Sequence, residues 1–191
     1  RWMTAGQSPN EYNRREISYI IRQDNGEEFC IRNMSYTDAS KLRKDVEKLT
    51  PLRIDIGPIY DNDAFFNKDA TKRGSAVARE YVIDIDMNDY NDIRTCCTGK
   101  TVCRSCWTFL VLAKEVLAEL LGSCFGFTNI LWVFSGRRGI HAWVSDWKAK
   151  TMSPKCRKAV TEFLNFTISS DKVNYLIKPA LLMKPHYPSL E

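Results

Sequence analysis

The sequence lacks a long apolar run. No stretch approaches the roughly 18 to 20 uncharged apolar residues that a membrane-spanning helix needs. It also lacks internal repeats and low-complexity tracts. A signal peptide is not apparent either, because Arg1-Trp2-Met3 leads directly into polar residues. Since the chain begins with arginine rather than methionine, we expect it to be a fragment of a longer protein.

A strong charge of one sign is absent as well. The 28 Lys and Arg residues exceed the 23 Asp and Glu residues by a net charge of +5. This mild basic excess permits an anionic partner but does not establish one. Of the 191 residues, 44% are apolar and 27% are charged, which is typical of a folded globular protein. The length suits one sizeable domain, with or without a small satellite.

Cysteine is the residue type whose distribution is most informative. Four of the seven cysteines fall within eleven residues, whereas a secreted disulfide-rich protein usually spreads an even number over a shorter chain. Four thiolates with a Cys-x-x-Cys spacing suit a tetrahedral structural Zn²⁺, so we expect zinc in a reducing compartment, with uncoordinated thiols as the alternative. The expected ligands are Cys96, Cys97, Cys103 and Cys106. The other three are expected to be small buried apolar residues: Cys30, Cys124 and Cys156.

Alternating hydrophobic patterns and turn residues predict the first half of the fold. Residues 16–22 and 28–33 flank the turn sequence Asp24-Asn25-Gly26 and predict a β-hairpin. Thr37 is expected to cap a helix over residues 38–49. Residues 52–60 predict a strand that Gly57-Pro58 bends, and residues 61–78 predict a loop.

The second half alternates strands and helices in the same manner. The expected strands are 79–87, 130–134 and 140–145, and the expected helices are 106–121, stopped at Gly122, and 154 to about 166. This order predicts an α+β fold, with a mixed or antiparallel sheet flanked by helices and a small zinc knuckle at 96–106.

Two carboxylates lie on one side of the strand at 79–87. Residues two apart in a strand face the same side, about 6 to 7 Å from each other, so Asp84 and Asp86 point together. Such a pair repels itself unless cations neutralise it, and Mg²⁺ prefers oxygen ligands of this kind. The alternative is an exposed polar face at a sheet edge. Asp89 and Asp92 are expected to form a solvated, helix-capping acidic turn.

A basic glycine turn connects the strands 130–134 and 140–145. Glycines let the backbone approach a bulky anion, and guanidinium groups bind phosphate oxygens in a bidentate manner. The turn therefore predicts a triphosphate site, in which the histidine donates to a phosphate oxygen or positions a ribose. The alternative is a solvated basic hairpin tip with a histidine satisfied in the core. The residues concerned are Ser135, Gly136, Arg137, Arg138, Gly139 and His141.

Together, these motifs resemble a known family. The run from Glu80 to Arg94, the cysteine set and Ser-Gly-Arg-Arg-Gly-Ile-His141 occur in the order found in the small, catalytic subunit of archaeo-eukaryotic replicative DNA primases, in its eukaryotic form. The resemblance covers most of residues 1–165. Supporting stretches are 1–3, 15–18, 53–57 and 173–178.

The resemblance implies roles for individual residues. Asp84 and Asp86 correspond to catalytic aspartates that bind Mg²⁺ or Mn²⁺. Lys178 resembles a lysine that reaches the phosphates, and Arg32 and Asp55 correspond to residues close to the incoming nucleotide. The nucleotide-binding residues implied by the turn are Ser135, Arg137, Arg138 and His141.

The chain departs from the family pattern in two ways. Family members are considerably longer, with a helical insert late in the chain. The third catalytic aspartate normally precedes the Asn-x-Leu-x-Lys stretch, but Phe166 stands at the matching spacing and Asp171 lies too close to Lys178. We expect that a segment is missing between about Phe166 and Thr167, rather than that the protein lacks one metal ligand. Residues 1–178 are expected to form the catalytic domain, and the tail 179–191 matches nothing.

The resemblance implies template-directed synthesis of short RNA primers on single-stranded DNA by two-metal nucleotidyl transfer, in the nucleus. It further implies a large primase subunit and DNA polymerase alpha as partners in a primosome, and ribonucleoside triphosphates as substrates. Two other functions remain open: a non-catalytic zinc-bearing nucleic-acid-binding module, and a different metal-dependent phosphotransferase or nuclease.

Overall fold

The computed structural model describes residues 11–62 and 74–164. The chain divides into two compact units. The first comprises residues up to Asp84 together with 129–151, and the second comprises 85–128 together with the residues from Met152 onward. In the part of the chain that is described, no helix is both long and apolar enough to cross a bilayer.

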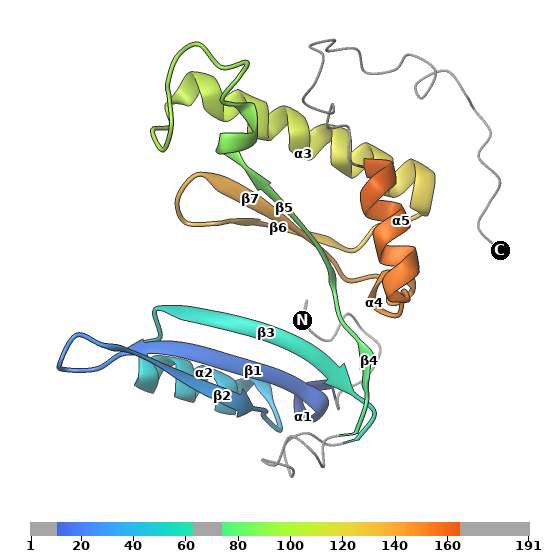
Figure 1. Ribbon diagram of the computed structural model, residues 1–191. Coiled ribbons are helices and arrows are strands. Elements are labelled where there is room, and N and C mark those ends of the chain that lie inside the picture. The colour runs from blue at the N-terminus through green and yellow to red at the C-terminus, as the bar shows by residue number, and fades with distance from the viewer. Residues whose placement is uncertain (1–10, 63–73, 165–191) are drawn as a thin grey trace. The chain divides into compact units, whose positions relative to one another are not determined.

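A four-stranded antiparallel sheet forms much of the first unit (Figure 1). The expected hairpin is confirmed, because β1 and β2 pair from Ile17↔Met34 to Arg22↔Glu28. A short helix α1 (Glu11–Arg14), which the sequence patterns did not predict, precedes β1. The strands are ordered β2-β1-β3-β4 and are β1 (Arg15–Arg22), β2 (Glu28–Met34), β3 (Arg53–Tyr60) and β4 (Ala76–Ala78).

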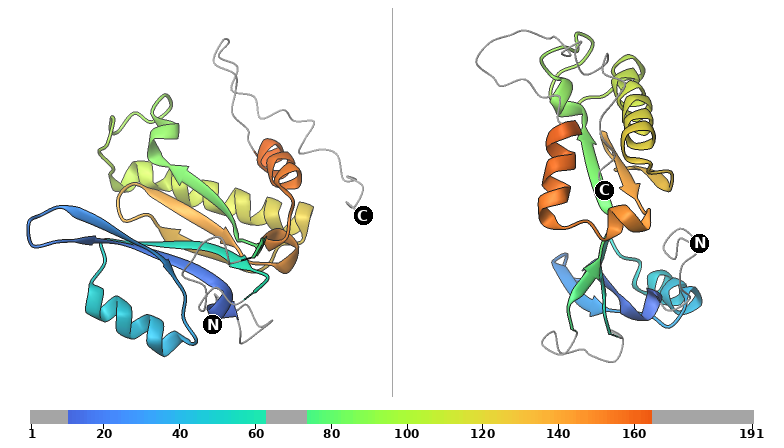
Figure 2. Two further views of the ribbon diagram at one scale, coloured as in Figure 1. Left: turned by 60° about the horizontal axis from the view of Figure 1, so that its bottom comes forward. Right: turned by 90° about the vertical axis from the view of Figure 1, so that its right-hand side faces the viewer.

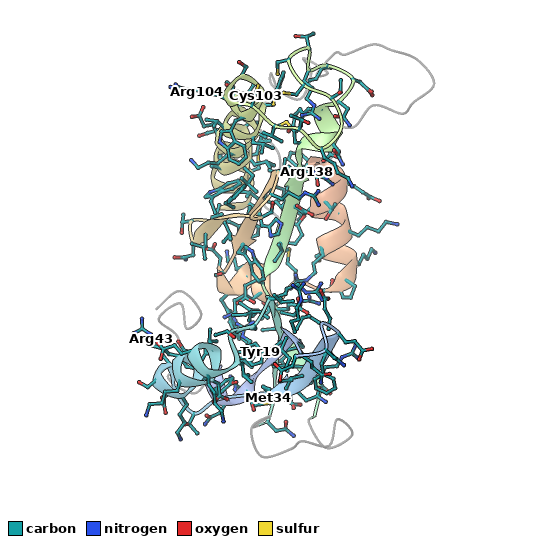
Figure 3. All side chains as sticks on the ribbon, turned by 90° about the vertical axis from the view of Figure 1, so that its left-hand side faces the viewer. Tyr19, Met34, Arg43, Cys103, Arg104 and Arg138 are labelled. Atoms are coloured by element: carbon teal, nitrogen blue, oxygen red, sulfur yellow. The ribbon has the colours of Figure 1, made fainter. Side chains whose placement is uncertain are left out.

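Helix α2 (Ala39–Leu49) covers one face of this sheet, and their contact is the core of the region (Figure 2). Ile17 and Tyr19 project from β1 and are almost fully buried. The hydroxyl of Tyr19 donates to the hydroxyl of Tyr36 over 2.8 Å, so the polar ends of both rings are satisfied inside the core. In Figure 3, the labels for Tyr19 and Met34 mark this sheet. The helix contributes Leu42, Val46 and Leu49.

The expected cap of α2 is wrong by one residue. Asp38, not Thr37, is the N-cap: its Oδ1 accepts the backbone N–H of Lys41 over 3.0 Å. Thr37 instead donates its hydroxyl to Asp38 Oδ2 over 2.9 Å. A carboxylate also interacts more favourably than a hydroxyl with the positive end of the helix dipole, and the pKa of Asp38 is lowered, mainly because it accepts the Lys41 amide.

Replacing Asp38 with alanine should lower the free energy of unfolding by about 1 kcal/mol, because one helical N–H loses its partner. Thr37→Ala should cost less, since Thr37 accepts no backbone N–H of the helix. Urea unfolding followed by circular dichroism measures both. Equal losses for the two variants would contradict the cap assignment.

Strand β3 continues through Gly57 and Pro58 to Tyr60, and its pairing with β1 shifts register opposite Arg15 and Ile17. A Cβ at Gly57 would lie 3.0 Å from Glu16 Cβ and 3.1 Å from its carbonyl oxygen. Glycine is therefore required here by the close approach of β1. The expected loop at 61–78 includes β4 at its end, and the rest of it lies partly outside the described residues.

A second sheet has the order β5-β7-β6 (Figure 1). Its strands are β5 (Tyr81–Asp86), β6 (Ile130–Phe134) and β7 (Gly139–Val144). β6 and β7 form an antiparallel hairpin whose base is closed by Asp146, which accepts the backbone N–H of Asn129 over 2.9 Å. The short helix α4 (Trp147–Lys150) follows and was not predicted.

The second unit contains the single-turn 3-10 helix η3 (Met87–Tyr90) and the helices α3 (Arg104–Phe125) and α5 (Pro154–Leu164). The expected stop of the long helix at Gly122 is wrong. Gly122 stays helical, and Gly126, with φ of 67°, is the C-cap. In this extra turn, the aromatic ring of Phe125 packs edge-on against Phe163 at 5.4 Å, a contact that stabilises it. Helices and antiparallel strands together confirm the α+β fold.

Candidate active site and metal centre

Strand β5 has one buried and one exposed side. Tyr81 and Ile85 are buried, whereas Val82 and Asp84 are exposed and Asp86 is partly exposed. The alternation confirms that the two carboxylates lie on the open side of the strand, opposite its apolar side. The division between the two compact units falls directly after Asp84.

Asp86 also begins the helix η3. Its Oδ1 accepts the backbone N–H of Asn88 over 2.8 Å, and Asp89 Oδ2 accepts the N–H of Asp86 over 3.4 Å. This reciprocal capping fixes the backbone where the strand ends. The expectation that Asp89 belongs to a helix-capping acidic turn is confirmed, and Asp92 is exposed there.

The hairpin β6–β7 brings His141 to Asp84. His141 Nε2 lies 3.3 Å from Asp84 Oδ1, and the histidine side chain is 32% exposed whereas that of Asp84 is 71% exposed. His141 is thus not a buried core histidine, which removes that alternative. The strand that carries the first carboxylate and the strand that follows the basic turn therefore present their polar groups to a common open site.

The turn itself is closed by its first and last residues. The Ser135 N–H donates to the Gly139 carbonyl over 2.9 Å, and the Ser135 hydroxyl accepts the Gly139 N–H over 2.9 Å. Gly136 has φ of 87°, a conformation that favours glycine. Arg137 is exposed and Arg138 is partly exposed. Figure 3 labels Arg138 on this turn.

Arg32 and Asp55 share the face of the four-stranded sheet that α2 leaves uncovered. Ile20 pairs with both Cys30 and Arg53, so the side chains of these three residues lie on one face, opposite the core residue Tyr19. Arg32 and Asp55 each come two residues later in their strands and therefore share this face. Arg32 Nε donates to Cys30 Sγ over 3.4 Å. Arg53 Nη2 donates to Asp55 Oδ2 over 3.3 Å, and Arg53 Nε lies 3.2 Å from Asp55 Oδ1. Arg53 is thus a charged residue of this face that the sequence patterns did not single out. Its two-residue spacing from Asp55 is the signal that could have identified it.

A buried ion pair supports the beginning of β5. Arg15 Nη1 and Nη2 donate to the two carboxylate oxygens of Glu80 over 2.6 and 2.7 Å, and Arg15 Nη1 also donates to the Gly57 carbonyl over 3.0 Å. Both side chains are only 2% exposed. Burial acts to raise the pKa of Glu80, but the hydrogen bonds and charge of Arg15 outweigh it, so the pKa is lowered. The sequence gives no local signal for this pair, because its members are 65 residues apart.

The four clustered cysteines meet at the start of α3. The four sulfur atoms all lie within 4.8 Å of one another, and they belong to Cys96, Cys97, Cys103 and Cys106. Cys103 is the N-cap of the helix, and its N–H donates to Cys106 Sγ over 3.1 Å. Figure 3 labels Cys103 at this end of α3. The sulfurs are close enough to bind a single tetrahedral ion. Among the described residues, they form the one group of three or more His, Cys, Asp or Glu side chains that could hold a metal ion.

Proton loss within the cluster is uneven. The pKa of Cys103 is lowered to about 6, chiefly because the Cys106 N–H donates to it. The pKa of Cys97 is raised to about 12, chiefly through its hydrogen bond to Cys103. Without a cation, the negative charge of one thiolate therefore hinders deprotonation of the next thiol. A divalent ion would relieve this repulsion. The donor set fits zinc.

The remaining cysteines correct an expectation. Cys124 and Cys156 are exposed and Cys30 is partly exposed, so none of them is a buried apolar residue. Their exposure makes them useful controls for the metal centre. Lys178, Phe166, Asp171 and the tail 179–191 lie outside the described residues.

Comparison with known proteins identifies the family of this chain. The family described as DNA primase small subunit matches residues 83–190, more than half of the chain. A DNA primase small subunit of Drosophila melanogaster is 41% identical over 166 residues, which is 86% of this chain and 37% of that protein. One of Schizosaccharomyces pombe is 33% identical over 193 residues, which is 97% of this chain and 41% of that protein. The chain thus spans well under half of either relative, and it belongs to the DNA primase small subunit family.

Proposed function

We propose that this chain carries the nucleotide-polymerising centre of a DNA primase, which joins ribonucleoside triphosphates into short RNA primers on single-stranded DNA. The observation that carries the proposal is the 3.3 Å approach of His141 Nε2 to Asp84 Oδ1. It puts the aspartate strand beside the strand that leaves the arginine turn. Metal ligands and phosphate ligands must be neighbours for phosphoryl transfer.

Each side chain then has a defined task. Asp84 and Asp86 supply carboxylate oxygens on the open side of β5, where they would hold Mg²⁺ or Mn²⁺. Bound, these cations would supply the charge that activates the attacking 3′-hydroxyl and stabilises the pyrophosphate. Arg137 and Arg138 bind the triphosphate. Ser135 belongs to the same nucleotide-binding turn and stabilises its conformation through the hydrogen bond from the Gly139 N–H.

His141 would donate a hydrogen bond from Nε2 to a phosphate oxygen or position the ribose. Asp84 Oδ1 lies 3.3 Å from that nitrogen. Arg32, Asp55 and Lys178 are proposed to lie near the incoming nucleotide, and contact with the 2′-hydroxyl would select ribose over deoxyribose.

The length of the chain bears on its activity. It spans 37% to 41% of the relatives described above. We propose that it is a truncated or internally deleted form, and that the third metal-binding aspartate of the family belongs to sequence missing near Phe166. A large primase subunit, DNA polymerase alpha, the primosome and a nuclear location are proposed from the family alone.

Incorporation of labelled UTP on a poly(dA) template tests the reaction, with the chain alone and together with a large primase subunit. We expect metal-dependent RNA products. Metal-dependent cleavage of the template without incorporation would instead identify a nuclease. Nucleotide and DNA binding without either reaction would identify a non-catalytic binding module.

The cysteine cluster is proposed to hold one structural Zn²⁺ that fixes the loop between β5 and α3. Metal analysis of protein purified without added metal should find about one zinc per chain. Cys97→Ser should lose most of this zinc, whereas the exposed Cys124→Ser should retain it. A metal-free wild-type protein after gentle purification would refute the assignment.

A further inference from the structure

Among the described residues, Arg94 is the one arginine buried beside the cysteine cluster. It stands two positions before Cys96, at the end of the turn that follows η3, and is 5% exposed. Burial of a guanidinium is unfavourable unless each of its donors finds an acceptor. The acceptors of Arg94 belong to the loop that carries the cysteines and to the first turn of α3.

The contacts of Arg94 connect three parts of this loop. Before the cysteines, Nε and Nη2 donate to Asn91 Oδ1 over 3.0 and 2.6 Å. Between Cys97 and Cys103, Nη1 donates to the Thr101 carbonyl over 2.8 Å, and Nη2 donates to the Gly99 carbonyl. Nη1 also lies 3.8 Å from Cys106 Sγ, within reach of a hydrogen bond to sulfur.

The positive charge of Arg94 also bears on the charge of the cysteine cluster. Four thiolates around one Zn²⁺ carry a net charge of −2, and Cys106 is fully buried. A buried excess charge needs a nearby counter-charge or donors. Arg94 supplies a permanent positive charge beside the buried sulfur, in addition to the Cys103 N–H and the N-terminus of the helix α3.

We propose that Arg94 is a positioning residue of the zinc centre, which holds the cysteine loop in its metal-binding shape and neutralises part of the charge of the tetrathiolate. The inference rests on the zinc site proposed above. Lysine could replace the charge but not the fork of donors that reaches Asn91, Gly99 and Thr101 together.

A matched control is available one residue after Cys103. Arg104 has the same charge and lies next to a ligand, but its side chain is exposed (Figure 3). Both Arg94→Met and Arg104→Met thus remove a positive charge near the proposed metal site. Only Arg94→Met also removes buried hydrogen bonds. Arg94→Lys separates the charge of Arg94 from its hydrogen-bonding geometry.

The test measures Zn²⁺ affinity of the full chain by competition with a chromophoric chelator. Substitutions around metal ligands typically weaken binding about 10- to 100-fold, and we expect a loss of this size for Arg94→Met. Arg94→Lys should show a smaller loss, and Arg104→Met should bind like wild type. The visible spectrum of the Co²⁺-loaded protein, which reports tetrahedral thiolate ligation, should be altered in Arg94→Met alone.

Two results would overturn the inference. One is equal Zn²⁺ affinity for Arg94→Met and Arg104→Met. The other is an Arg94→Met protein that loses its helical circular dichroism even in excess Zn²⁺, since Arg94 would then serve the fold and not the metal. If the wild-type chain binds no Zn²⁺, the zinc site itself is refuted, and that outcome is distinct from both.

Discussion

Replacing Asp84 with asparagine should reduce incorporation of UTP on poly(dA) by about 100- to 1,000-fold, the loss typical of removing one preorganised charge from a reaction centre. The substitution keeps the shape of the side chain and removes the charge that would hold a divalent cation. Because the Asp84 side chain is 71% exposed, the fold should tolerate asparagine. The measurement is initial rate at saturating UTP and Mn²⁺, using whichever assembly shows activity.

Asp92→Asn is the matched control for this variant. Asp92 belongs to the same acidic segment and is exposed, but it lies beyond the strand that presents Asp84 and Asp86. Its rate should equal that of wild type. An unchanged rate for Asp84→Asn would show that the reaction does not need this carboxylate. An equal loss for Asp92→Asn would show that general negative charge matters here and not a carboxylate at one position.

Replacing Glu80 with glutamine should lower the free energy of unfolding by about 3 to 5 kcal/mol, because it leaves the charge of Arg15 buried without a partner. Both members of the pair are 2% exposed, so water cannot take over the lost interaction. Such a loss is a large share of the total stability of a typical domain, which is about 5 to 15 kcal/mol. Urea unfolding gives the value directly.

An exposed ion pair provides the comparison. Arg43 and Glu47 lie one turn apart on α2, with side chains 81% and 67% exposed. Glu47→Gln should change stability by less than about 0.5 kcal/mol. Replacing both Arg15 and Glu80 by apolar residues should cost less than Glu80→Gln alone, since no unpaired charge remains. A loss in Glu80→Gln no larger than in Glu47→Gln would refute the buried pair.

The same pair makes stability depend on pH. Because the folded pKa of Glu80 lies below its unfolded value, its contribution is complete above the unfolded pKa. The contribution is lost as the pH falls through the folded pKa, when the carboxylate takes up a proton. Wild type should therefore lose stability in acid more steeply than Glu80→Gln. Parallel acid profiles would contradict this.

The residues that the sequence predicted best are those whose chemistry depends on short spacings. Asp84 and Asp86 follow from the two-residue period of a strand, and the four cysteines follow from a loop only a few residues long. The α+β class and most element positions were predicted from the same local patterns. The contact of His141 with Asp84 was anticipated only as a shared site, because pairing of β5 with β7 is not a local property.

The errors have physical causes of the same kind. Asp38 and Thr37 are both capping residues, and only the backbone conformation decides which of them accepts the helical N–H. Glycine at 122 predicts a stop, but the helix continues to the next glycine, and Phe125 in the added turn packs on Phe163. The pair of Arg15 with Glu80, 65 residues apart, depends on a tertiary contact that no spacing reveals. The contacts of Arg94 lie within one short loop and its helix, but they depend on how the loop folds.

The most direct test of the proposed centre is anomalous diffraction from crystals of the chain grown with Mn²⁺ and UTP. We predict Mn²⁺ between the carboxylates of Asp84 and Asp86 and the triphosphate, whose oxygens contact Arg137 and Arg138. Manganese bound elsewhere on the chain, or a triphosphate remote from the turn 135–141, would contradict the account.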